Sequence, residues 1–534
     1  MKKQLVTIAA SVCLILAVVA LSVASCAEVE PGPTPGPGPT PPTPPVGEPQ
    51  YGGDLRIGSV LSPPILFPNR MVGGDPDPIL YTVIECFARW GAGGEFVPWL
   101  ATSWEEDAEA KTITVHLREG VKFHDGSDFD AEAAKWSLDY LLSDLVRGHG
   151  AFIAALESTE VIDDYTIRVH IEPYQTTTLQ QVLRHKFVSP TAYEKNGMEW
   201  AELNPVGTGP FKFVSWKRNV NIKFERFDDY WGGKPYLDTV EWIEYKDSMV
   251  LMASFLAGEV DAVIMVDPKD ATEIAEYGKF TVQTCPGELQ VFLPDGDHDY
   301  SVWSNLLVRQ AGNYAIDRQA ICDAVGYGYW RPAFQHSIGP EHWSYNPDVE
   351  GYPYNPEKAR ELLAEAGYPD GFKTTLYRES VPLSEVLAAT AVQGYLNAVG
   401  IDTHLELLEH ARFAEIAAGG GWENGIASFW IKTSSPGILN NQNVFYHEGS
   451  IYFPSALKPK EYTDLLAKTV QEADFEKRKA MVWELQYLMV DKYAFAVQIY
   501  QTTSIAVKYP ELHGDGLYEI TRMQWIPETA WLSK

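Results

Sequence analysis

Cysteine and positive charge are both scarce in this chain of 534 residues. Only three of its five cysteines, Cys86, Cys285 and Cys322, lie beyond residue 50, and their long spacings exclude a disulfide-rich scaffold and a metal knuckle. We expect buried thiols, and the spacings leave open whether two of them pair. Lysine and arginine number 42 against 72 acidic residues, a formal net charge of −30. This balance argues against nucleic-acid binding, which needs a basic groove.

Motifs of hydrolases and nucleotide-binding enzymes are missing as well. The sequence has no HExxH, no GxSxG and no Walker-type phosphate loop. The run PDGDHDY at 294–300 alternates aspartates as a calcium loop does. However, the sixth position counted from Asp295 is Tyr300 and the twelfth is Leu306, where such a loop has glycine and glutamate. We therefore expect no metal, no cofactor and no enzymatic activity. A lipid-anchored hydrolase is the alternative, and a structural or sensory surface protein is a third.

Long hydrophobic runs are confined to the N-terminus. Lys2 and Lys3 precede an apolar run from Leu5 to Ala20, which is typical of a secretory signal. The following VASC, at 23–26, resembles the bacterial lipobox and predicts cleavage before Cys26 with a diacylglycerol on its sulfur. An ordinary signal with an incidental cysteine is the other interpretation.

A proline-rich segment follows the predicted signal. Residues 31–45 contain nine prolines, which favour extended polyproline II and cannot build a core. We assign 1–26 to the signal and lipobox, and 27–50 to a linker that reaches on the order of 70 Å.

Strand and helix patterns alternate along the remaining chain. The stretches 52–60 and 165–172 alternate polar and apolar residues as strands do, and 112–123 reads as a strand, a glycine turn and a second strand. Asp130 is placed to cap one helix, and Asn355 begins another that ends at Gly367. The body is therefore predicted to be mixed α/β.

Taken in order, these segments resemble the bacterial extracellular solute-binding proteins of family 5, which include the oligopeptide- and dipeptide-binding components of ABC importers. The matching pieces cover nearly all of the body: YGGDLRIG (51–58), the stretch 97–141, NPVGTGPFKFVSW (204–216), FERFDDYWGGKPYLDTVEW (224–242), FLAGEVDAVI (255–264), LLVRQAGNYAIDRQAI (306–321) and YPYNPEKARELLAEAGYPDGF (352–372).

The resemblance implies a two-lobed, periplasmic-binding-protein-like α/β fold of the large cluster C type, with a hinge and an inserted subdomain. The implied boundaries are 51–84, 201–290 and 495–534 for lobe I, 85–200 for the inserted subdomain and 291–494 for lobe II. It also implies a monomer that carries a peptide or other small solute to an ABC permease with cytoplasmic ATPases. The expected location is outside the cytoplasm, in the periplasm or at the outer face of the cell membrane, with a lipid anchor in the membrane.

The stretch GIASFWIKTSSPGILNNQNVFYH at 425–447 bears on the solute. In peptide-binding relatives, the corresponding segment carries an aspartate four positions before a proline, and that aspartate accepts the α-ammonium of the peptide. Counting back from Pro436 gives Lys432, so a cation replaces this anchor. A shifted alignment with Lys432 in solvent is the alternative, although no acidic residue lies between Ile426 and Tyr446.

We expect the segment 430–446 to line the solute site with donor-rich side chains. A peptide or peptide-like solute is the first expectation, and an oligosaccharide or an anionic solute the second. The predicted ligand-binding residues are Trp430, Lys432, Ser434, Ser435, Asn441, Asn443 and Tyr446.

Overall fold

The computed structural model describes residues 47–60, 63–68, 77–91, 95–142, 155–337, 339–340, 342–431, 438–521 and 524–533. Cys26, the signal and nearly all of the linker lie outside these residues, so their assignment stays a prediction. The part from Pro49 onward is a unit of its own and is described here by itself.

Strands and short helices dominate the first half of the body. The strands are β1 (Asp54–Ser59), β2 (Glu85–Cys86), β3 (Ala88–Trp90), β4 (Phe96–Pro98), β5 (Ala101–Asp107), β6 (Thr112–Leu117), β7 (Leu156–Asp163), β8 (Thr166–Ile171), β9 (Lys186–Phe187), β10 (Phe211–Lys217), β11 (Asn221–Arg226), β12 (Thr239–Glu244), β13 (Ala262–Ile264) and β14 (Thr281–Pro294). The helices are α2 (Asp77–Leu80), α3 (Ala131–Tyr140), α5 (Thr176–Leu183), α6 (Pro190–Asn196), α7 (Met198–Ala201), α8 (Ser248–Leu256) and α9 (Pro268–Glu276).

Longer helices dominate the second half. They are α10 (Leu306–Tyr314), α11 (Arg318–Gly326), α12 (Pro356–Glu365), α13 (Leu383–Ala398), α14 (His410–Glu415), α15 (Ile438–Tyr446), α16 (Lys460–Thr469) and α17 (Phe475–Tyr487). Short helical turns lie at Val302–Ser304, Ile416–Gly420 and Leu488–Lys492. The strands are β15 (Arg331–Pro332), β16 (Phe372–Glu379), β17 (Ile401–Leu408), β18 (Ile426–Ile431), β19 (Val497–Lys508), β20 (Leu512–His513) and β21 (Trp531–Leu532).

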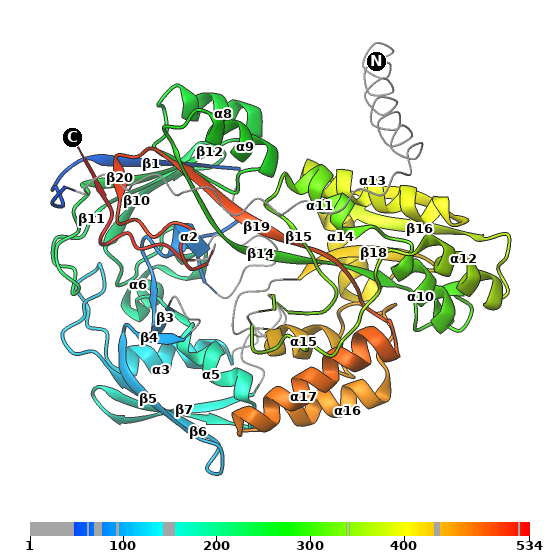
Figure 1. Cartoon of the computed structure of the whole chain (residues 1–534). Coiled ribbons are helices and arrows are strands. Elements are labelled where there is room, and N and C mark those ends of the chain that lie inside the picture. The colour runs from blue at the N-terminus through cyan, green and yellow to red at the C-terminus, as the bar shows by residue number, and fades with distance from the viewer. Residues whose placement is uncertain are drawn as a thin grey trace. The chain divides into compact units, whose positions relative to one another are not determined.

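One large sheet runs through both lobes. Among the described residues its strand order is β10-β11-β12-β1-β13-β19-β14-β18-β16-β17, and β15 pairs with β19 beside this path. The first five strands belong to lobe I, and β18, β16 and β17 belong to lobe II. The two long strands between them, β14 and β19, span from one lobe to the other (Figure 1).

The two crossing strands change register where they pass between the lobes. On the lobe I side, Thr281 to Pro286 of β14 pair with β19, and on the lobe II side the pairing resumes at Leu289. The register shift between Pro286 and Leu289 is a β-bulge or irregularity, a feature that bends a strand locally. The register shift lies where the resemblance implies a hinge.

Each lobe packs apolar side chains on both faces of its part of the sheet. In β13, Ala262 and Ile264 belong to one lobe I core and Val263 to another, as the alternation of a strand requires. In β14, Leu293 and Phe292 divide in the same way between two lobe II cores. The buried residues of the lobe I cores are distinct from those of the lobe II cores among the residues described, but half-buried Tyr329 packs against one core of each lobe.

The inserted subdomain has a core of its own. Its four-stranded sheet has the order β5-β6-β8-β7, and α3 and α5 pack against it. Asp130 caps α3 as predicted, with its carboxylate accepting from the Ala133 N–H, and Asn355 caps α12 in the same way. Gly367, just after α12, has a φ of +93°, which is the left-handed geometry that favours glycine.

Local patterns were confirmed for most predicted elements, with one error. β1 and β8 fall inside the predicted strands, and β6 fills the first part of 112–123. The predicted second strand there is wrong: Lys122 makes only an isolated bridge to Asp128, because the chain turns back at Gly126 before a ladder can extend. The expected buried thiols are confirmed, because Cys86, Cys285 and Cys322 are buried and form no disulfide with one another.

Candidate functional site

The crossing strands bring lobe II side chains to the boundary between the lobes. Gln290 of β14 is buried, and its Nε2 donates to Ser428 Oγ at 2.6 Å and to the Phe429 carbonyl at 2.8 Å. Trp430 of β18 lies opposite Gln290 in the ladder and is half-buried. The amide of Gln290 therefore holds β18 against β14. Its two partners, Ser428 and Phe429, directly precede the segment 430–446 that is predicted to line the solute site.

Helix α15 forms the second half of the segment 430–446, and its polar residues lie on two different faces. Ile438, Gln442 and Tyr446 recur at intervals of four and are fully buried against lobe II. Tyr446 packs edge-on against Tyr462 and Phe495, and burial raises the pKa of its hydroxyl. The structure thus places the predicted ligand residue Tyr446 inside the lobe II core.

The other predicted ligand residues lie in different settings. Trp430 is at the end of β18, and Asn441 is half-buried on α15. Their contact with a solute stays a prediction. Lys432, Ser434 and Ser435 lie outside the described residues.

The inserted subdomain touches lobe II through the first turn of α5. The Thr176 N–H donates to the Val470 carbonyl at 2.7 Å, and the Thr176 hydroxyl donates to the same oxygen at 3.2 Å. Val470 is the C-cap residue of α16. The first N–H groups and the last carbonyls of a helix have no partner within their own helix, so these two helix ends satisfy each other.

Two side-chain pairs extend this contact to α15. Gln181 Nε2 donates to Asn440 Oδ1 at 2.9 Å, and Asn443 Nδ2 lies 3.5 Å from Gln175 Oε1, at the long end for a hydrogen bond. The predicted site residue Asn443 therefore meets the subdomain in this structure. We call the following six residues the α5 contact: Gln175, Thr176, Gln181, Asn440, Asn443 and Val470.

A charged group lies at the edge of the α5 contact. The Tyr174 hydroxyl donates to Glu106 Oε1 at 3.0 Å within the subdomain. Desolvation raises the pKa of Glu106, and the positive charge of Arg478, on α17 of lobe II, opposes this rise. Unlike charges thus face each other across the boundary between the subdomain and lobe II.

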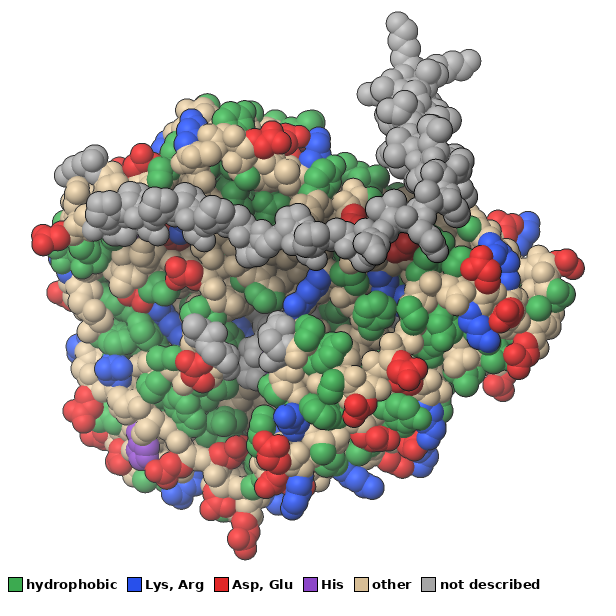
Figure 2. Space-filling model, in the orientation of Figure 1, with side chains coloured by type: hydrophobic (Ala, Val, Ile, Leu, Met, Phe, Trp, Pro, Cys, Tyr) green, Lys and Arg blue, Asp and Glu red, His purple; other side chains and the backbone are tan. Residues whose placement is uncertain are grey.

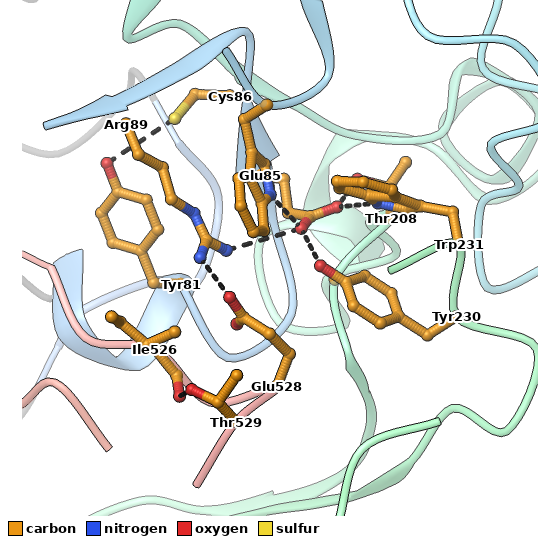
Figure 3. Close-up of polar contacts among 12 residues, drawn as sticks. Tyr81, Glu85, Cys86, Arg89, Thr208, Tyr230, Trp231, Ile526, Glu528 and Thr529 are labelled. Atoms are coloured by element: carbon orange, nitrogen blue, oxygen red, sulfur yellow. Dashed lines mark hydrogen bonds and ion pairs between the residues drawn. The ribbon is translucent and has the colours of Figure 1, made fainter. Parts of the chain in front are cut away.

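A second polar centre, shown in Figure 3, is enclosed within lobe I and the subdomain. Glu85 is fully buried, and its carboxylate accepts from Trp99 Nε1 at 2.6 Å, the Tyr230 hydroxyl at 2.7 Å, Trp231 Nε1 at 2.8 Å and the Thr208 hydroxyl at 2.9 Å. Four donors from three separate parts of the chain therefore converge on one carboxylate.

Arg89 connects this carboxylate to the C-terminal segment. Its Nη2 lies 3.5 Å from Glu85 Oε1, its Nη1 lies 2.7 Å from Glu528 Oε1, and its guanidinium stacks 3.6 Å from the Trp99 ring centroid. Burial raises the pKa of Glu85, while Arg89 and the side-chain donors oppose that rise. Because the acceptor oxygens of Glu85 are already occupied and buried, we assign this centre a structural role in attaching the subdomain to lobe I.

A surface hollow of about 830 Å³ lies between α3 and α6. Trp136, Tyr140 and Tyr193 form its aromatic wall, and carboxylates such as Glu132 and Glu194 surround them. The described residues that line it all come from the inserted subdomain, so this hollow is separate from the space between the lobes.

The surface is predominantly acidic, as the net charge requires. Acidic side chains are spread over the face in Figure 2, many of them along its outline. In the part of the chain that the structure describes, no three His, Cys, Asp or Glu side chains gather as a metal site. None of the helices described is both long and apolar enough to cross a membrane.

Sequence reasoning missed the subdomain side of the α5 contact. Thr176 and Gln181 belong to TTTLQQVL, a short polar helix that carries no motif. Their partners are separated from them by 294 and 259 positions in the sequence. On α15 a signal was present, because the spacing of Ile438, Gln442 and Tyr446 marks a buried helical face.

Comparison with known proteins identifies relatives of the whole body. The family model of bacterial extracellular solute-binding proteins, family 5 Middle, matches residues 95–449. The glutathione-binding protein GsiB of Salmonella paratyphi A is 31% identical over 339 residues, which is 62% of this chain and 65% of that protein. The match thus spans less than two thirds of the length of GsiB.

Solved structures share the fold. The periplasmic binding protein DppA from Helicobacter pylori, in complex with the peptide STSA, superposes with a TM-score of 0.78 at 23% identity, covering 91% of this chain and 99% of DppA. NikA from Brucella suis, in complex with Fe(III)-EDTA, superposes with a TM-score of 0.76 at 22% identity, covering 89% and 100%. At these identities the two structures establish the fold alone. The family match covers more than half of the sequence, and the chain belongs to the bacterial extracellular solute-binding proteins of family 5.

Proposed function

We propose that this protein is the extracytoplasmic solute-binding lipoprotein of an ABC importer. It captures a solute between lobes I and II and presents the closed form to a permease pair with cytoplasmic ATPases. The observation that carries this proposal is the crossing of β14 and β19, which join two separately cored lobes at a shift in register, in a member of a solute-binding family.

The proposed mechanism is closure of the lobes about the crossing strands. A solute favours the closed form only by making contacts to both lobes that the open form lacks. Closure also removes water from the solute, which strengthens its polar contacts. The buried core residues of the two lobes are distinct among those described, so each lobe can move as a body while the packing of Tyr329, which contacts a core of each lobe, adjusts.

For the solute, we propose a peptide or a peptide-like molecule. The names of GsiB and of the DppA complex, glutathione-binding and peptide-bound, support this class. The Fe(III)-EDTA in the NikA complex supports an anionic solute as the alternative. An oligosaccharide is the other alternative. A lysine at position 432 favours a carboxylate over a free α-ammonium. The proposed wall includes Trp430, Asn441 and the segment with Lys432, Ser434 and Ser435.

We further propose that the protein binds without catalysis, acts as a monomer and follows the domain boundaries given above. A hydrolase would need a nucleophile or a paired acid and base facing the space between the lobes. The sequence carries no HExxH or GxSxG motif that would supply such groups.

A thermal-shift screen of the purified chain tests the function. The probes are glutathione, the peptide STSA, an oligosaccharide set and Fe(III)-EDTA, each with mass-spectrometric analysis of products. We expect at least one peptide-like probe to stabilise the protein, because a ligand at 100 times its Kd adds about 2.7 kcal/mol to the free energy of unfolding. Sustained conversion of a probe to product would show an enzyme, and no shift with any class would contradict solute capture.

Lys432 gives a sharper test of the solute class. We expect Lys432→Asp to strengthen binding of peptides with a free amino terminus and to weaken binding of acidic probes, because it replaces a repelling charge with an attracting one. Lys458→Asp is the control, since Lys458 Nζ bonds to backbone carbonyls within lobe II. Equal affinities for all probes in Lys432→Asp and the parent would place Lys432 outside the solute site.

Cys26 gives a test of the anchor. We propose that its sulfur carries the lipid, which contributes about 0.8 kcal/mol per buried methylene. Cys26→Ala should therefore leave the membrane fraction, whereas Cys322→Ala, which alters a buried thiol, should remain there. Retention of processed Cys26→Ala in the membrane would refute the anchor.

A further inference from the structure

Two helices meet end to end in the α5 contact. The first residue of α5 donates twice to the carbonyl of Val470, which caps the C-terminus of α16. A helix carries a partial positive charge at its N-terminus and a partial negative charge at its C-terminus, so the two ends also attract each other. Figure 1 shows α5 beside α15, α16 and α17, on the same side of the crossing strands.

The contact is polar, and the apolar cores on its two sides are separate. The subdomain core contains Val182 and Leu183 of α5, and the lobe II core contains Leu466 and Val470, yet the two cores share no residue among those described. Separating the surfaces would therefore expose little apolar area. The freed polar groups would bond to water, so each contact has only a modest net stabilising effect.

The same subdomain is attached to lobe I by apolar packing. Cys86 and Val188 belong to the lobe I core, and Trp136, Tyr140 and Tyr193 pack against it. The subdomain therefore moves with lobe I. The α5 contact is one of the places where this unit meets lobe II in the structure, beside the pair Glu106 and Arg478 and the packing of Tyr329.

We infer that the α5 contact is a latch that holds the lobes closed before any solute binds, and so sets the affinity from outside the solute site. This inference rests on the proposed function, because the latch closes the space proposed for the solute. The apparent Kd of a binding protein is the intrinsic Kd of its closed form divided by the fraction of molecules that are closed. A latch that raises this fraction before the solute arrives therefore lowers the apparent Kd.

Thr176→Pro is the sharpest variant for this test. Thr176 is the first residue of α5, where proline is well tolerated, and Gln175 before it is extended (φ −142°, ψ 127°), as a residue before proline must be. Proline removes both donors to Val470 without removing an intrahelical bond. Gln180→Ala is the matched control, because Gln180 lies on the same helix and is half-buried outside the α5 contact.

The measurement is pulsed electron paramagnetic resonance on the full chain with no solute added. Spin labels are placed at Glu157→Cys on β7 and Lys477→Cys on α17, both exposed, in a background with Cys13→Ser and Cys26→Ser. Cys86, Cys285 and Cys322 are buried and should not label.

We expect a mainly closed distance distribution in the parent and in Gln180→Ala. Thr176→Pro should raise the open-to-closed ratio about tenfold, in line with the loss of two hydrogen bonds at one position. Gln181→Ala should raise it by a smaller factor and tests the latch independently if the proline variant misfolds. Distributions that match the parent in both variants would overturn the inference.

This experiment separates the latch from the function. It needs no solute, so a failed binding screen leaves its outcome intact. Opening by Thr176→Pro in a protein that binds no probe would support the latch and refute solute capture. Unchanged distances in a protein that binds a probe would refute the latch alone.

Discussion

The inserted subdomain is attached to its two neighbours in opposite ways. Toward lobe I it buries a carboxylate with four donors and an arginine, and it adds aromatic side chains to the lobe I core. Toward lobe II it makes hydrogen bonds through the N-terminus and the polar side chains of α5. The first attachment is fully buried and the second is only partly buried. The comparison teaches that burial, rather than the number of hydrogen bonds, decides which neighbour the subdomain follows.

The largest expected effect comes from breaking the buried attachment. Glu85→Ala leaves Arg89 without one carboxylate and four donors without an acceptor, in a place that water does not reach. We expect a loss of about 3–5 kcal/mol in the free energy of unfolding, the range for a broken buried charge pair. Urea unfolding followed by tryptophan fluorescence measures it. Glu132→Ala, an exposed change on α3, is the control, and equal midpoints for the two variants would contradict the assigned role.

A pH titration sharpens the comparison inside the subdomain. His185 is 4% exposed, and burial lowers its pKa to about 3, while Ser137 Oγ lies 2.9 Å from its Nε2. The unfolded imidazole takes up a proton below pH 6.5, whereas the folded one stays neutral. The stability it contributes is therefore present above pH 6.5 and is lost as the pH falls toward 3. The loss between pH 7 and pH 5 is about 2 kcal/mol.

The variant His185→Gln isolates this effect, because glutamine keeps a donor for Ser137 and does not titrate. Its free energy of unfolding should fall about 2 kcal/mol less than that of the parent between pH 7 and pH 5. His170→Gln, at a partly exposed position on β8 of the subdomain, controls for the substitution. Parallel pH curves for His185→Gln and the parent would mean that water reaches the ring.

Weakening the attachment to lobe II should have only a small effect on the free energy of unfolding. We expect Thr176→Pro to change the free energy of unfolding by less than about 1 kcal/mol, since its lost hydrogen bonds are replaced by water. A loss as large as that of Glu85→Ala would show that the α5 contact is part of the folded core. The comparison would then fail.

The smallest effect should appear in binding. Gln181→Ala removes one side-chain hydrogen bond of the α5 contact, worth about 0.5–1 kcal/mol at most. The apparent Kd is the intrinsic Kd divided by the closed fraction, and the parent is expected to be mainly closed. We therefore expect the apparent Kd of Gln181→Ala for a bound peptide probe to rise at most about twofold, with unchanged affinity in Gln180→Ala. Calorimetric titration measures both, and a decrease in Kd would contradict a closing role for Gln181.

Elements that depend on neighbours in sequence were predictable. Asp130 and Asn355 cap helices because a short side chain reaches an N–H two or three residues ahead. β8 follows from alternation alone. A second strand was wrongly predicted after β6 because Val121 and Phe123 alternate with polar residues and are buried, as in a strand. The chain turns at Gly126, so too few residues remain to pair with a neighbouring strand.

The candidate site was less predictable, since it is assembled from distant segments. Asn440 and Asn443 were recognisable as a donor-rich stretch, but their partners on α5 lie more than 250 positions away. No local pattern encodes such pairs. Tyr446 was assigned to the solute wall from its neighbours in sequence, whereas the helical spacing from Gln442 turns it into the core.

The end-to-end meeting of α5 and α16 also bears on how long a captive molecule stays. Both hydrogen bonds of Thr176 end on one oxygen, so a single small separation breaks them together. If separation precedes escape, each 1.4 kcal/mol held there lengthens the dwell time about tenfold, whatever molecule is inside. A partner that pulls the two helix ends apart would shorten the dwell time without touching the cargo.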